Sequence, residues 1–537
     1  MLPDVNSDTF RLLIPEIILV VMAAWIFVAG AFTSGQGPWR LFAIVGMLFV
    51  AFALYNQDTS LKVYSNQPLF DTSGPLLVDA IGHSMRWLAW LSGLLLVLLS
   101  SRATNDGLRT EYLGALLLIV AGLMLSCTTG EMVTIFVSLE LISIPTYILL
   151  FLGHRGASPH EAAMKYFFLS IASSALFLYG LSFLYGIAGG TQLSQLQVAL
   201  ATPGGADPVA SGLIPVAMLL VLAGLGFKIA AVPFHFYAPD VYQGASSGNA
   251  GLLAVVPKIA GVLVLVRFLA AVAPSIAANG WTILLVLAAI TMTVGNVTAL
   301  WQTNVRRLMA YSSIAHAGYL LIGLAVAAGG IGGAEATSSQ GLGATLFYLV
   351  TYVIATLGTF AAFAFLGNDE SDISSLDDLA GLGTARPVIA LTLAVFMFSL
   401  AGIPPLAGFF GKLSLFLGAL SVDRPTGLSS IHTWFVVLAI IGALNAAISA
   451  AYYLRVVATM YFRPATRLTD PDGGLGAGLA AILAAILVIA VGVSPGTLSG
   501  RLLRASRSFA ADSPSELAET ISDIEVRLTQ FKVEESR

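Results

Sequence analysis

Long runs of apolar residues alternate with short polar segments along almost the whole chain. A helix needs roughly 20 apolar residues to cross the hydrocarbon core of a bilayer, because lipid offers no partners for free backbone groups. This criterion predicts about fourteen membrane-spanning helices. Their approximate bounds are 11–30, 39–56, 77–100, 110–127, 131–152, 161–187, 213–237, 249–275, 281–301, 306–327, 342–366, 388–420, 432–462 and 475–496. The expected fold is therefore an all-α polytopic membrane protein.

The flanks of these runs predict how the chain is oriented. Asp4 and Asp8 precede the first run where a signal peptide would be basic, and no small-residue cleavage site follows, so we expect this helix to remain in the mature protein. Lysine and arginine gather in the loops after odd-numbered helices, which predicts that both termini lie on the outer side of a bacterial plasma membrane.

Four polar segments outside the runs carry no sign of chemistry. Residues 57–76 have the composition of a small hairpin, and the alternating pattern of 497–537 indicates a surface helix or a solvated cap. The glycine-rich segments 188–212 and 328–341 lack the strand-to-helix context of a phosphate-binding loop, so we expect linkers without a nucleotide site.

Composition agrees with a membrane protein and excludes several functions. The chain is 57% hydrophobic and only 10% charged, whereas an ordinary soluble domain is about a quarter charged. Its net charge of -4 indicates no nucleic-acid partner. A single cysteine, Cys127, excludes internal disulfides and cannot ligate an iron–sulfur centre or a thiolate zinc site. We therefore expect no cofactor or metal in this chain, and redox chemistry only in partner subunits.

Ionisable residues inside the predicted spans are the informative chemistry. Each costs roughly 2.5 to 3.5 kcal/mol at the centre of a membrane helix on insertion scales, so such residues are seldom idle. Six on five helices imply a hydrated polar axis enclosed by protein. These candidate proton-transfer residues are Glu140, Lys165, Lys228, His235, Lys258 and Lys412.

Competing structural interpretations exist for several of these residues. Lys165 lies close to the start of its span, so its side chain is able to extend to the surface. Glu140 could stabilise a helix-packing lysine, and His235 could bridge a broken helix as a satisfied histidine. Three further residues within or near spans are interpreted as structural, namely Arg86, Arg267 and Arg455.

Two spans contain prolines that should break them. Pro233 follows Lys228 in the seventh span, and Pro404 and Pro405 precede Lys412 in the twelfth. Proline removes a backbone donor and clashes with the preceding turn, and a broken membrane helix is tolerated only where it is buried in protein or lines a polar cavity.

The positions of the breaks predict an internal repeat. Helices four to eight and nine to thirteen form two sets of five, with the broken helix fourth in each. Because five is odd, the second set should be inverted relative to the first, as in many transporters. The expected organisation is a three-helix segment, two repeats, and a last helix with its tail; their bounds are 1–109, 110–275, 281–462 and 463–537.

Four runs resemble one family. The run 226–245 (GFKIAAVPFHFYAPDVYQGA) resembles the seventh-helix signature of the antiporter-like subunits of respiratory complex I and of multisubunit cation/proton antiporters. The runs 138–141 (SLEL, followed by Pro145), 306–319 (RRLMAYSSIAHAGY) and 399–412 (SLAGIPPLAGFFGK) support it. Within this family the chain resembles the N-type subunit of bacterial NADH:quinone oxidoreductase, because it has a lysine at position 412, about fourteen spans and no long lateral helix after the last span. The M-type usually has glutamate at that place, and the L-type continues into a long helix.

This resemblance implies the roles of the candidate residues. It implies a Glu/Lys pair at Glu140 and Lys165, a central lysine at Lys228, a connecting residue at Lys258 with His235 nearby, and an exit-side residue at Lys412. Lysine suits a relay because burial changes its proton affinity readily.

The resemblance also implies partners and an energy source. The partners would be M-, L-, K- and J-type membrane subunits and a peripheral arm that holds FMN, iron–sulfur clusters and quinone. The implied function is proton translocation driven by quinone reduction in those subunits. The alternatives are a subunit of a multisubunit sodium/proton antiporter and a scaffold whose inner charges serve assembly.

Overall fold

The computed structural model describes residues 7–33, 37–60, 75–77, 79–100, 108–153, 157–201, 208–276, 280–330, 335–367, 373–422, 430–465 and 474–511. The hairpin expected within 57–76 lies mostly outside these residues, and so does the tail beyond position 511.

The described residues are almost entirely helical. The first half contains α1 (Ser7–Phe32), α2 (Trp39–Ser60), α3 (Ala80–Leu99), α4 (Arg109–Cys127), α5 (Met132–Gly153), α6 (Ala157–Ala188), α7 (Leu193–Ala201), α8 (Pro208–Ile229), α9 (Tyr237–Gly244) and α10 (Ser247–Ile276). The second half contains α11 (Gly280–Ala299), α12 (Val305–Gly329), α13 (Glu335–Leu366), the 3-10 turn η3 (Leu376–Leu379), α14 (Leu382–Ala385), α15 (Pro387–Ala401), α16 (Ala407–Ser421), α17 (Ser430–Phe462), α18 (Gly474–Val493) and α19 (Pro495–Ala511). The linker expected at 188–212 contains the short helix α7.

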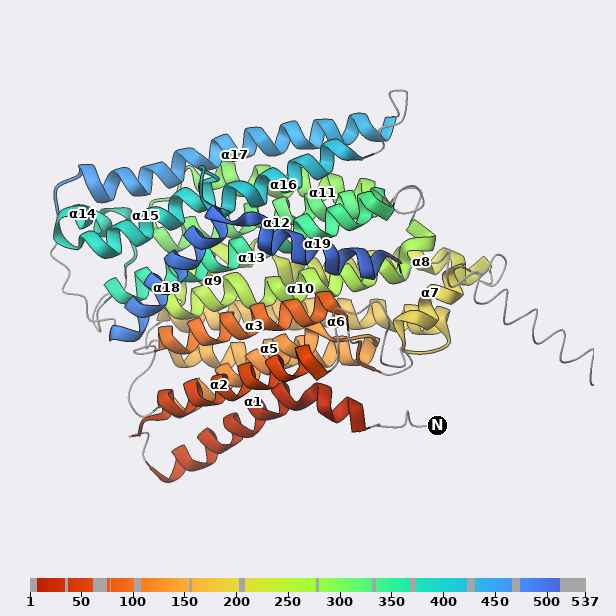
Figure 1. Cartoon of the computed structure of the whole chain (residues 1–537), viewed down its shortest axis with the longest axis horizontal. Coiled ribbons are helices and arrows are strands. Elements are labelled where there is room, and N and C mark those ends of the chain that lie inside the picture. The colour runs from red at the N-terminus through yellow and green to blue at the C-terminus, as the bar shows by residue number, and fades with distance from the viewer. Residues whose placement is uncertain are drawn as a thin grey trace, which may run out of the picture.

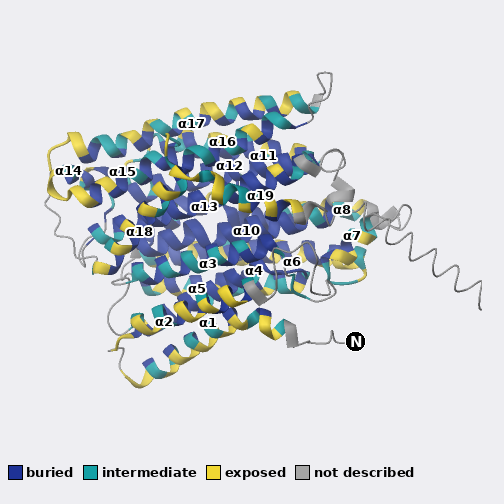
Figure 2. Ribbon diagram, viewed as in Figure 1, coloured by how far each residue is buried: buried dark blue, intermediate teal, exposed yellow. Residues whose placement is uncertain are grey.

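The long helices lie side by side in one bundle, with α1 and α2 at one edge and α17 at the opposite edge (Figure 1). Buried residues concentrate in the middle of the bundle, around α10 and α13 (Figure 2). In the most apolar 18-residue stretch of α10 every residue is buried, and in the corresponding stretches of α12 and α13 the buried shares are 94% and 89%. Polar side chains on these three helices must therefore find partners within the protein.

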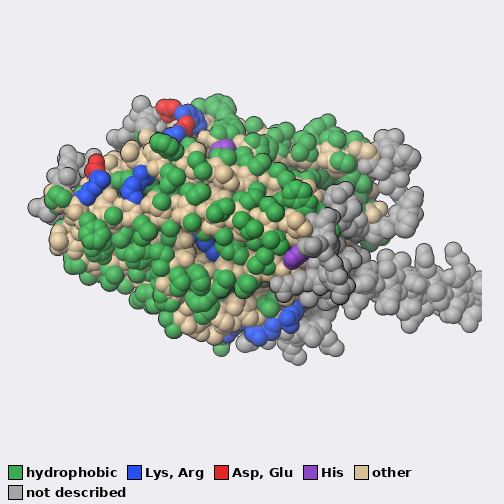
Figure 3. Space-filling view, turned by 90° about the horizontal axis from the view of Figure 1, so that it is seen from above, with side chains coloured by type: hydrophobic (Ala, Val, Ile, Leu, Met, Phe, Trp, Pro, Cys, Tyr) green, Lys and Arg blue, Asp and Glu red, His purple; other side chains and the backbone are tan. Residues whose placement is uncertain are grey.

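The number of membrane crossings agrees with the sequence. Thirteen helices of the described chain are long and apolar enough to cross a membrane, and the shorter apolar helices α15 and α16 together form one more broken crossing. Large apolar side chains such as Trp434, Ile440 and Leu444 are exposed on α17. Hydrophobic side chains are spread over the face seen in Figure 3, with few charges among them. These surfaces suit contact with lipid or with apolar partner helices.

Both predicted breaks are present, and they end their first half-helix in the same way. Ala230 after α8 and Gly402 after α15 adopt left-handed backbone conformations, with φ of 58° and 87°. In each case the next residue donates its backbone N–H to a carbonyl five residues back: Ala231 to Gly226 at 2.8 Å, and Ile403 to Phe398 at 2.9 Å. This is the hydrogen bond of a Schellman cap, so the two broken helices share a local design.

The N-terminal helices are tied to the bundle by buried ion pairs. Arg86 of α3 donates to Glu16 of α1 at 2.6 Å and to Gln57 of α2 at 2.9 Å. Arg267 of α10 makes a two-pronged contact with Asp79, at 2.8 and 2.7 Å. The structural interpretation of Arg86 and Arg267 fits these contacts, since each guanidinium joins separate helices.

Candidate functional site

Lys228 lies at the end of α8 among side chains from α5 and α6. Its ammonium donates to the hydroxyls of Ser143 at 2.7 Å and Ser170 at 3.3 Å, and the residue is 6% exposed. Glu140, three residues before Ser143 on α5, accepts a hydrogen bond from Ser174 at 2.5 Å. The carboxylate of Glu140 interacts electrostatically with Lys228. Glu140 of α5 and Lys228 of α8 thus lie in one polar cluster with serine hydroxyls from neighbouring turns of α5 and α6.

The Glu140–Lys165 pair expected from the family resemblance is not formed. The Lys165 ammonium lies 2.7 Å from Glu161 and 3.3 Å from Asp240, and its side chain is 43% exposed. Lys165, near the start of its helix, contacts these two charged groups in this structure, and the role of Lys165 in proton transfer stays a prediction. Lys228 and Glu140 instead contact the same face of α6, since Lys228 donates to Ser170 and Glu140 accepts from Ser174 one turn away.

Asp240 is the centre of this surface cluster, in the short helix α9 outside the candidate membrane spans. Arg307, at the start of α12, donates to its other carboxylate oxygen at 2.6 Å. Partial burial raises the pKa of Asp240, but hydrogen bonds from Arg307 and Lys165 outweigh burial and hold the pKa below its ordinary value. The cluster therefore joins α6, α9 and α12 through charges.

Lys258 of α10 is held entirely by α12 and α13. Its ammonium donates to the backbone carbonyl and the hydroxyl of Ser313, the latter at 2.7 Å, and to the Tyr352 hydroxyl at 3.3 Å. Gly261, one turn further along α10, packs so tightly that an added Cβ would lie 3.3 Å from the Cβ of Lys228. The first broken helix therefore contacts the face of α10 that carries Lys258.

His316 of α12 is a candidate that the sequence analysis did not select. Its two ring nitrogens lie 2.5 Å from the Tyr348 hydroxyl and 3.0 Å from the Tyr453 hydroxyl, and it is 2% exposed. It interacts electrostatically with both Lys258 and Lys412. The signal was present, because His316 is an ionisable residue in the middle of a predicted span and lies within one of the family runs.

Lys412 of α16 lies beside the second break. Its ammonium donates to the Ala401 carbonyl at the end of α15 at 3.0 Å and to Ser449 of α17 at 3.4 Å. It also lies 4.8 Å from the centre of the Tyr319 ring. The carbonyl end of a half-helix carries partial negative charge, which favours a cation. Lys412 thus contacts the carbonyl end of the first half of its own broken crossing.

His235 lies in the break between α8 and α9 and is half-buried. Its buried Nδ1 has no hydrogen-bond partner among the described residues. No hydrogen bond in the described part of the chain joins it directly to Lys258, and the connecting role expected for the two residues stays a prediction.

The three buried lysines share one kind of environment. At least one hydroxyl contacts each ammonium, and a backbone carbonyl also contacts those of Lys258 and Lys412. No ion pair with a carboxylate within 4 Å is seen for Lys228, Lys258 or Lys412 in the described chain. A serine or tyrosine hydroxyl accepts from an ammonium and, after rotation, donates to a neutral amine. Such partners serve both protonation states, whereas a contacting carboxylate would favour the charged state.

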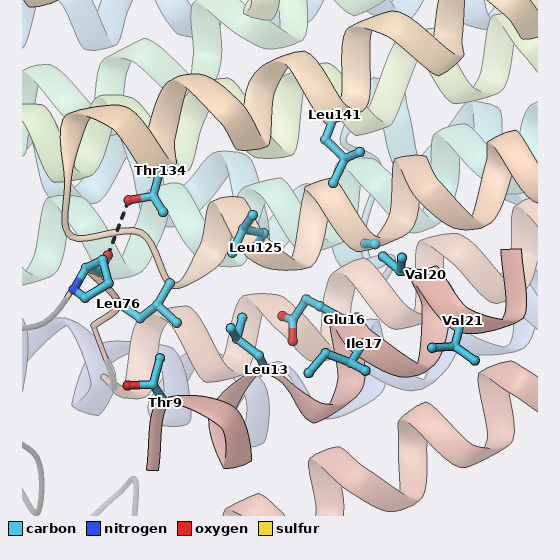
Figure 4. Close-up of a pocket in the computed structure, with 12 residues that line it drawn as sticks. Thr9, Leu13, Glu16, Ile17, Val20, Val21, Leu76, Leu125, Thr134 and Leu141 are labelled. Atoms are coloured by element: carbon cyan, nitrogen blue, oxygen red, sulfur yellow. Dashed lines mark hydrogen bonds between the residues drawn. The ribbon is translucent and has the colours of Figure 1, made fainter. Parts of the chain in front are cut away.

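Metal-binding groups and pockets are the further features of the described chain that bear on a cofactor. The described residues contain no group of three or more His, Cys, Asp and Glu side chains placed to hold a metal ion. One pocket between α1, α4 and α5 is lined almost wholly by apolar side chains, with the Glu16 carboxylate among them (Figure 4). It contains none of the six candidate residues.

Comparison with protein families gives one match, which covers all six candidate residues. The model described as "NADH:quinone oxidoreductase/Mrp antiporter, TM" matches residues 129–450. The chain is 35% identical over 464 residues to NADH-quinone oxidoreductase subunit N of Trichlorobacter lovleyi, covering 86% of this chain and 89% of that protein. It is 37% identical over 471 residues to the corresponding subunit of Desulfitobacterium hafniense, covering 85% and 90%.

Solved structures show the same similarity. A chain of respiratory complex I from Thermus thermophilus matches with a TM-score of 0.72 and 31% identity, over 91% of this chain and 100% of that one. A chain of the Mrp complex from Dietzia sp. matches with a TM-score of 0.77 and 20% identity, over 93% and 98%. The second similarity concerns the fold alone.

Proposed function

This chain belongs to the N-type subunits of NADH:quinone oxidoreductase, within the NADH:quinone oxidoreductase/Mrp antiporter family. On that premise, we propose that the chain itself conducts protons along its own buried residues. As a member of this family it is a multi-pass membrane subunit of a larger assembly. The proposal concerns the path: from Glu140 and Lys228 through Lys258 and His316 to Lys412.

The observation that carries the proposal is the common environment of the three lysines. Each ammonium sits among groups able to hold either protonation state, and each lies next to a neighbouring station. Gly261 brings α10 against Lys228. Tyr352 contacts both Lys258 and the His316 ring, and Tyr319 contacts both Lys412 and the His316 ring. Hydroxyls of Ser313, Tyr352 and Tyr453 provide short hydrogen-bonded links, and water would complete the remaining steps.

A change at Glu140 would start the sequence. Its negative charge favours the protonated form of Lys228, and desolvation favours the neutral form. Weakening the interaction with Glu140 would release the proton of Lys228 toward Lys258. The released proton would then pass His316 and leave through Lys412, whose protonated form is favoured by the Ala401 carbonyl. Lys228, Lys258, His316 and Lys412 would thus act as successive proton stations, with Glu140 controlling the first.

The energy must come from outside this chain. Moving one proton against a potential costs about 2.3 kcal/mol per 100 mV. We propose that quinone reduction in partner subunits, which would hold the FMN and iron–sulfur clusters, supplies this energy. Glu140 is half-buried on α5, with the apolar side chains of Val137 and Ile144 exposed near it. This face suits a neighbouring membrane subunit of the K or M type, whose movement would reach Glu140. J- and L-type subunits would complete the membrane arm of the complex. Both termini of this chain would lie on the outer side of the membrane.

The test is proton translocation per electron in vesicles that contain the whole complex. Lys258→Met should abolish the share of pumping that passes through this subunit while the complex assembles, because methionine fills a similar volume but cannot carry a proton. Arg463→Gln is the control, since Arg463 forms an exposed pair with Asp377 away from the lysines. Unchanged pumping in Lys258→Met would contradict the proposal.

A further inference from the structure

The last described helix, α19, packs along a membrane helix but carries a charged face. Leu503 lies against Gly343 of α13, and the Ser506 hydroxyl donates to the Ser339 carbonyl at 2.8 Å. Both α13 positions belong to the candidate span that begins at Thr337. The helix α19 therefore lies beside a membrane-spanning segment.

The depth of α19 follows from the helix before it. Gly492, near the end of α18, packs on Pro405 and Leu406 in the break between α15 and α16, which is midway along a broken membrane crossing. In Figure 1, α19 runs from the middle of the bundle toward its right-hand edge, alongside α13. At about 1.5 Å per residue, Arg501 lies about 9 Å and Arg507 about 18 Å beyond the start of the helix. Half the hydrocarbon core is about 15 Å thick, so the face crosses from hydrocarbon to headgroups.

Three arginines form the exposed face of α19, which we call the arginine face: Arg501, Arg504 and Arg507. Residues 495–511 contain no acidic side chain, and no ion pair joins the three arginines to any described residue. Buried Leu502, Ala505 and Ser506 fix the opposite side of the helix against the bundle. The arginines therefore point away from the bundle, without an anionic partner among the described residues.

The same side of the chain faces lipid just before α19. Ile486, Ile489 and Val493 are exposed on α18, which is itself a candidate membrane span. On α19, which begins after the non-helical Ser494, the exposed positions include Thr497, Arg501 and Arg504, again three or four residues apart. Exposed apolar side chains on the membrane helix α18 are thus followed along the chain by exposed basic side chains on α19.

We propose that the arginine face binds the phosphates of anionic phospholipids, in the leaflet on the side where α12 ends and α13 begins. An unpaired charge at this depth is costly unless its side chain reaches the headgroup region. A guanidinium offers two parallel N–H groups that match a phosphate diester. Arginines without a partner among the described residues, their depth, and the exposed apolar side chains of α18 together fit a phospholipid better than an acidic protein, which would also have to cover those apolar side chains.

The test uses the whole complex in nanodiscs that contain a photoactivatable phosphatidylglycerol. The peptide that contains α19 is analysed for lipid adducts by mass spectrometry, and a matched phosphatidylcholine probe measures labelling without net charge. Each basic residue near an anionic membrane surface adds about fivefold to affinity. Wild-type α19 should be labelled several-fold more by the anionic probe, and Arg501→Gln/Arg504→Gln/Arg507→Gln should lose at least about tenfold of that labelling.

Two further variants keep the result interpretable. The triple lysine replacement retains the charge and should keep most of the labelling, which separates charge from loss of structure. Arg463→Gln removes an exposed arginine elsewhere and should change nothing on α19. Equal labelling by both probes, labelling that survives the triple glutamine change, or protection of α19 by an acidic protein segment, including residues 512–537, would each overturn the proposal.

Discussion

The Lys228 ammonium lies 2.7 Å from the Ser143 hydroxyl, and Ser143 is one turn of α5 from Glu140. This relationship places the acidic residue of α5 and the lysine of the first broken helix in the same polar cluster. It also separates both from Lys165, which pairs with Asp240 at the surface. The two lysines should therefore respond differently to replacement.

Glu140→Gln should lower proton translocation per electron, whereas Lys165→Gln should leave it near the wild-type value. The glutamine removes the charge that favours protonated Lys228, and a change of about 1.4 kcal/mol in that preference alters its proton occupancy about tenfold. Both are measured in vesicles that contain the complex, with assembly checked by subunit composition. Equal loss in the two variants would restore the Glu140–Lys165 pair as the functional unit.

His316→Gln should greatly slow proton transfer through the subunit. Glutamine keeps hydrogen-bonding groups near Tyr348 and Tyr453 but does not titrate, and a positioned acid or base typically contributes about 100-fold or more. Rapid-quench or pH-dye kinetics in vesicles would measure the step. The control is His432→Gln, since His432 at the start of α17 bonds to the carbonyl of Val422, which directly follows α16. A His316 variant as fast as the control would remove His316 from the path.

Asp240→Asn should destabilise the chain near neutral pH by about 1 kcal/mol or less, because the ion pairs are partly exposed. The folded-state pKa of Asp240 lies below its unfolded value of about 3.9. The contribution is therefore complete above about pH 4 and is lost only as the pH falls through the lower folded-state pKa. Thermal unfolding of wild type and variant should differ equally at pH 7 and pH 5. A difference that already vanishes at pH 5 would contradict this account.

Asp79→Asn should reduce the yield of assembled complex and leave pumping per assembled complex unchanged. The change leaves Arg267, which is 4% exposed, without its carboxylate, and breaking a buried ion pair typically costs about 3 to 5 kcal/mol. The comparison is Asp377→Asn, which breaks an exposed pair with Arg463 and should cost about 1 kcal/mol at most. Loss of pumping in fully assembled Asp79→Asn complex would show that this pair does more than hold helices together.

Ala230→Gly should stabilise the chain slightly, by about 1 kcal/mol or less. The left-handed conformation at this position disfavours a residue with a Cβ and suits glycine, which already stands at the matching Gly402. Ala231→Gly, at a neighbouring position without a positive φ, should instead be neutral or destabilising. Thermal unfolding of both variants tests the comparison, and an equal loss of stability in the two would argue against the shared cap.

The sequence alone determined the number of crossings, both breaks and the burial of three lysines. These features depend on local composition: a run of about 20 apolar residues must be helical in lipid, and a proline within it must interrupt the helix. Lys228, Lys258 and Lys412 could be selected because they lie too far from the ends of their spans to reach water. The distance in sequence from each lysine to the ends of its span was sufficient to predict its burial.

Only the tertiary structure decided which residues meet. Lys165 joins Asp240 and not Glu140, and His316 packs on tyrosines that contact Lys258 and Lys412, because helix packing brings together residues far apart in sequence. Contact across helices depends on the rotation and depth of each helix, which a hydrophobic pattern does not specify. The sequence thus identified most of the buried ionisable residues, and the packing of α5, α10, α12 and α16 determined their order.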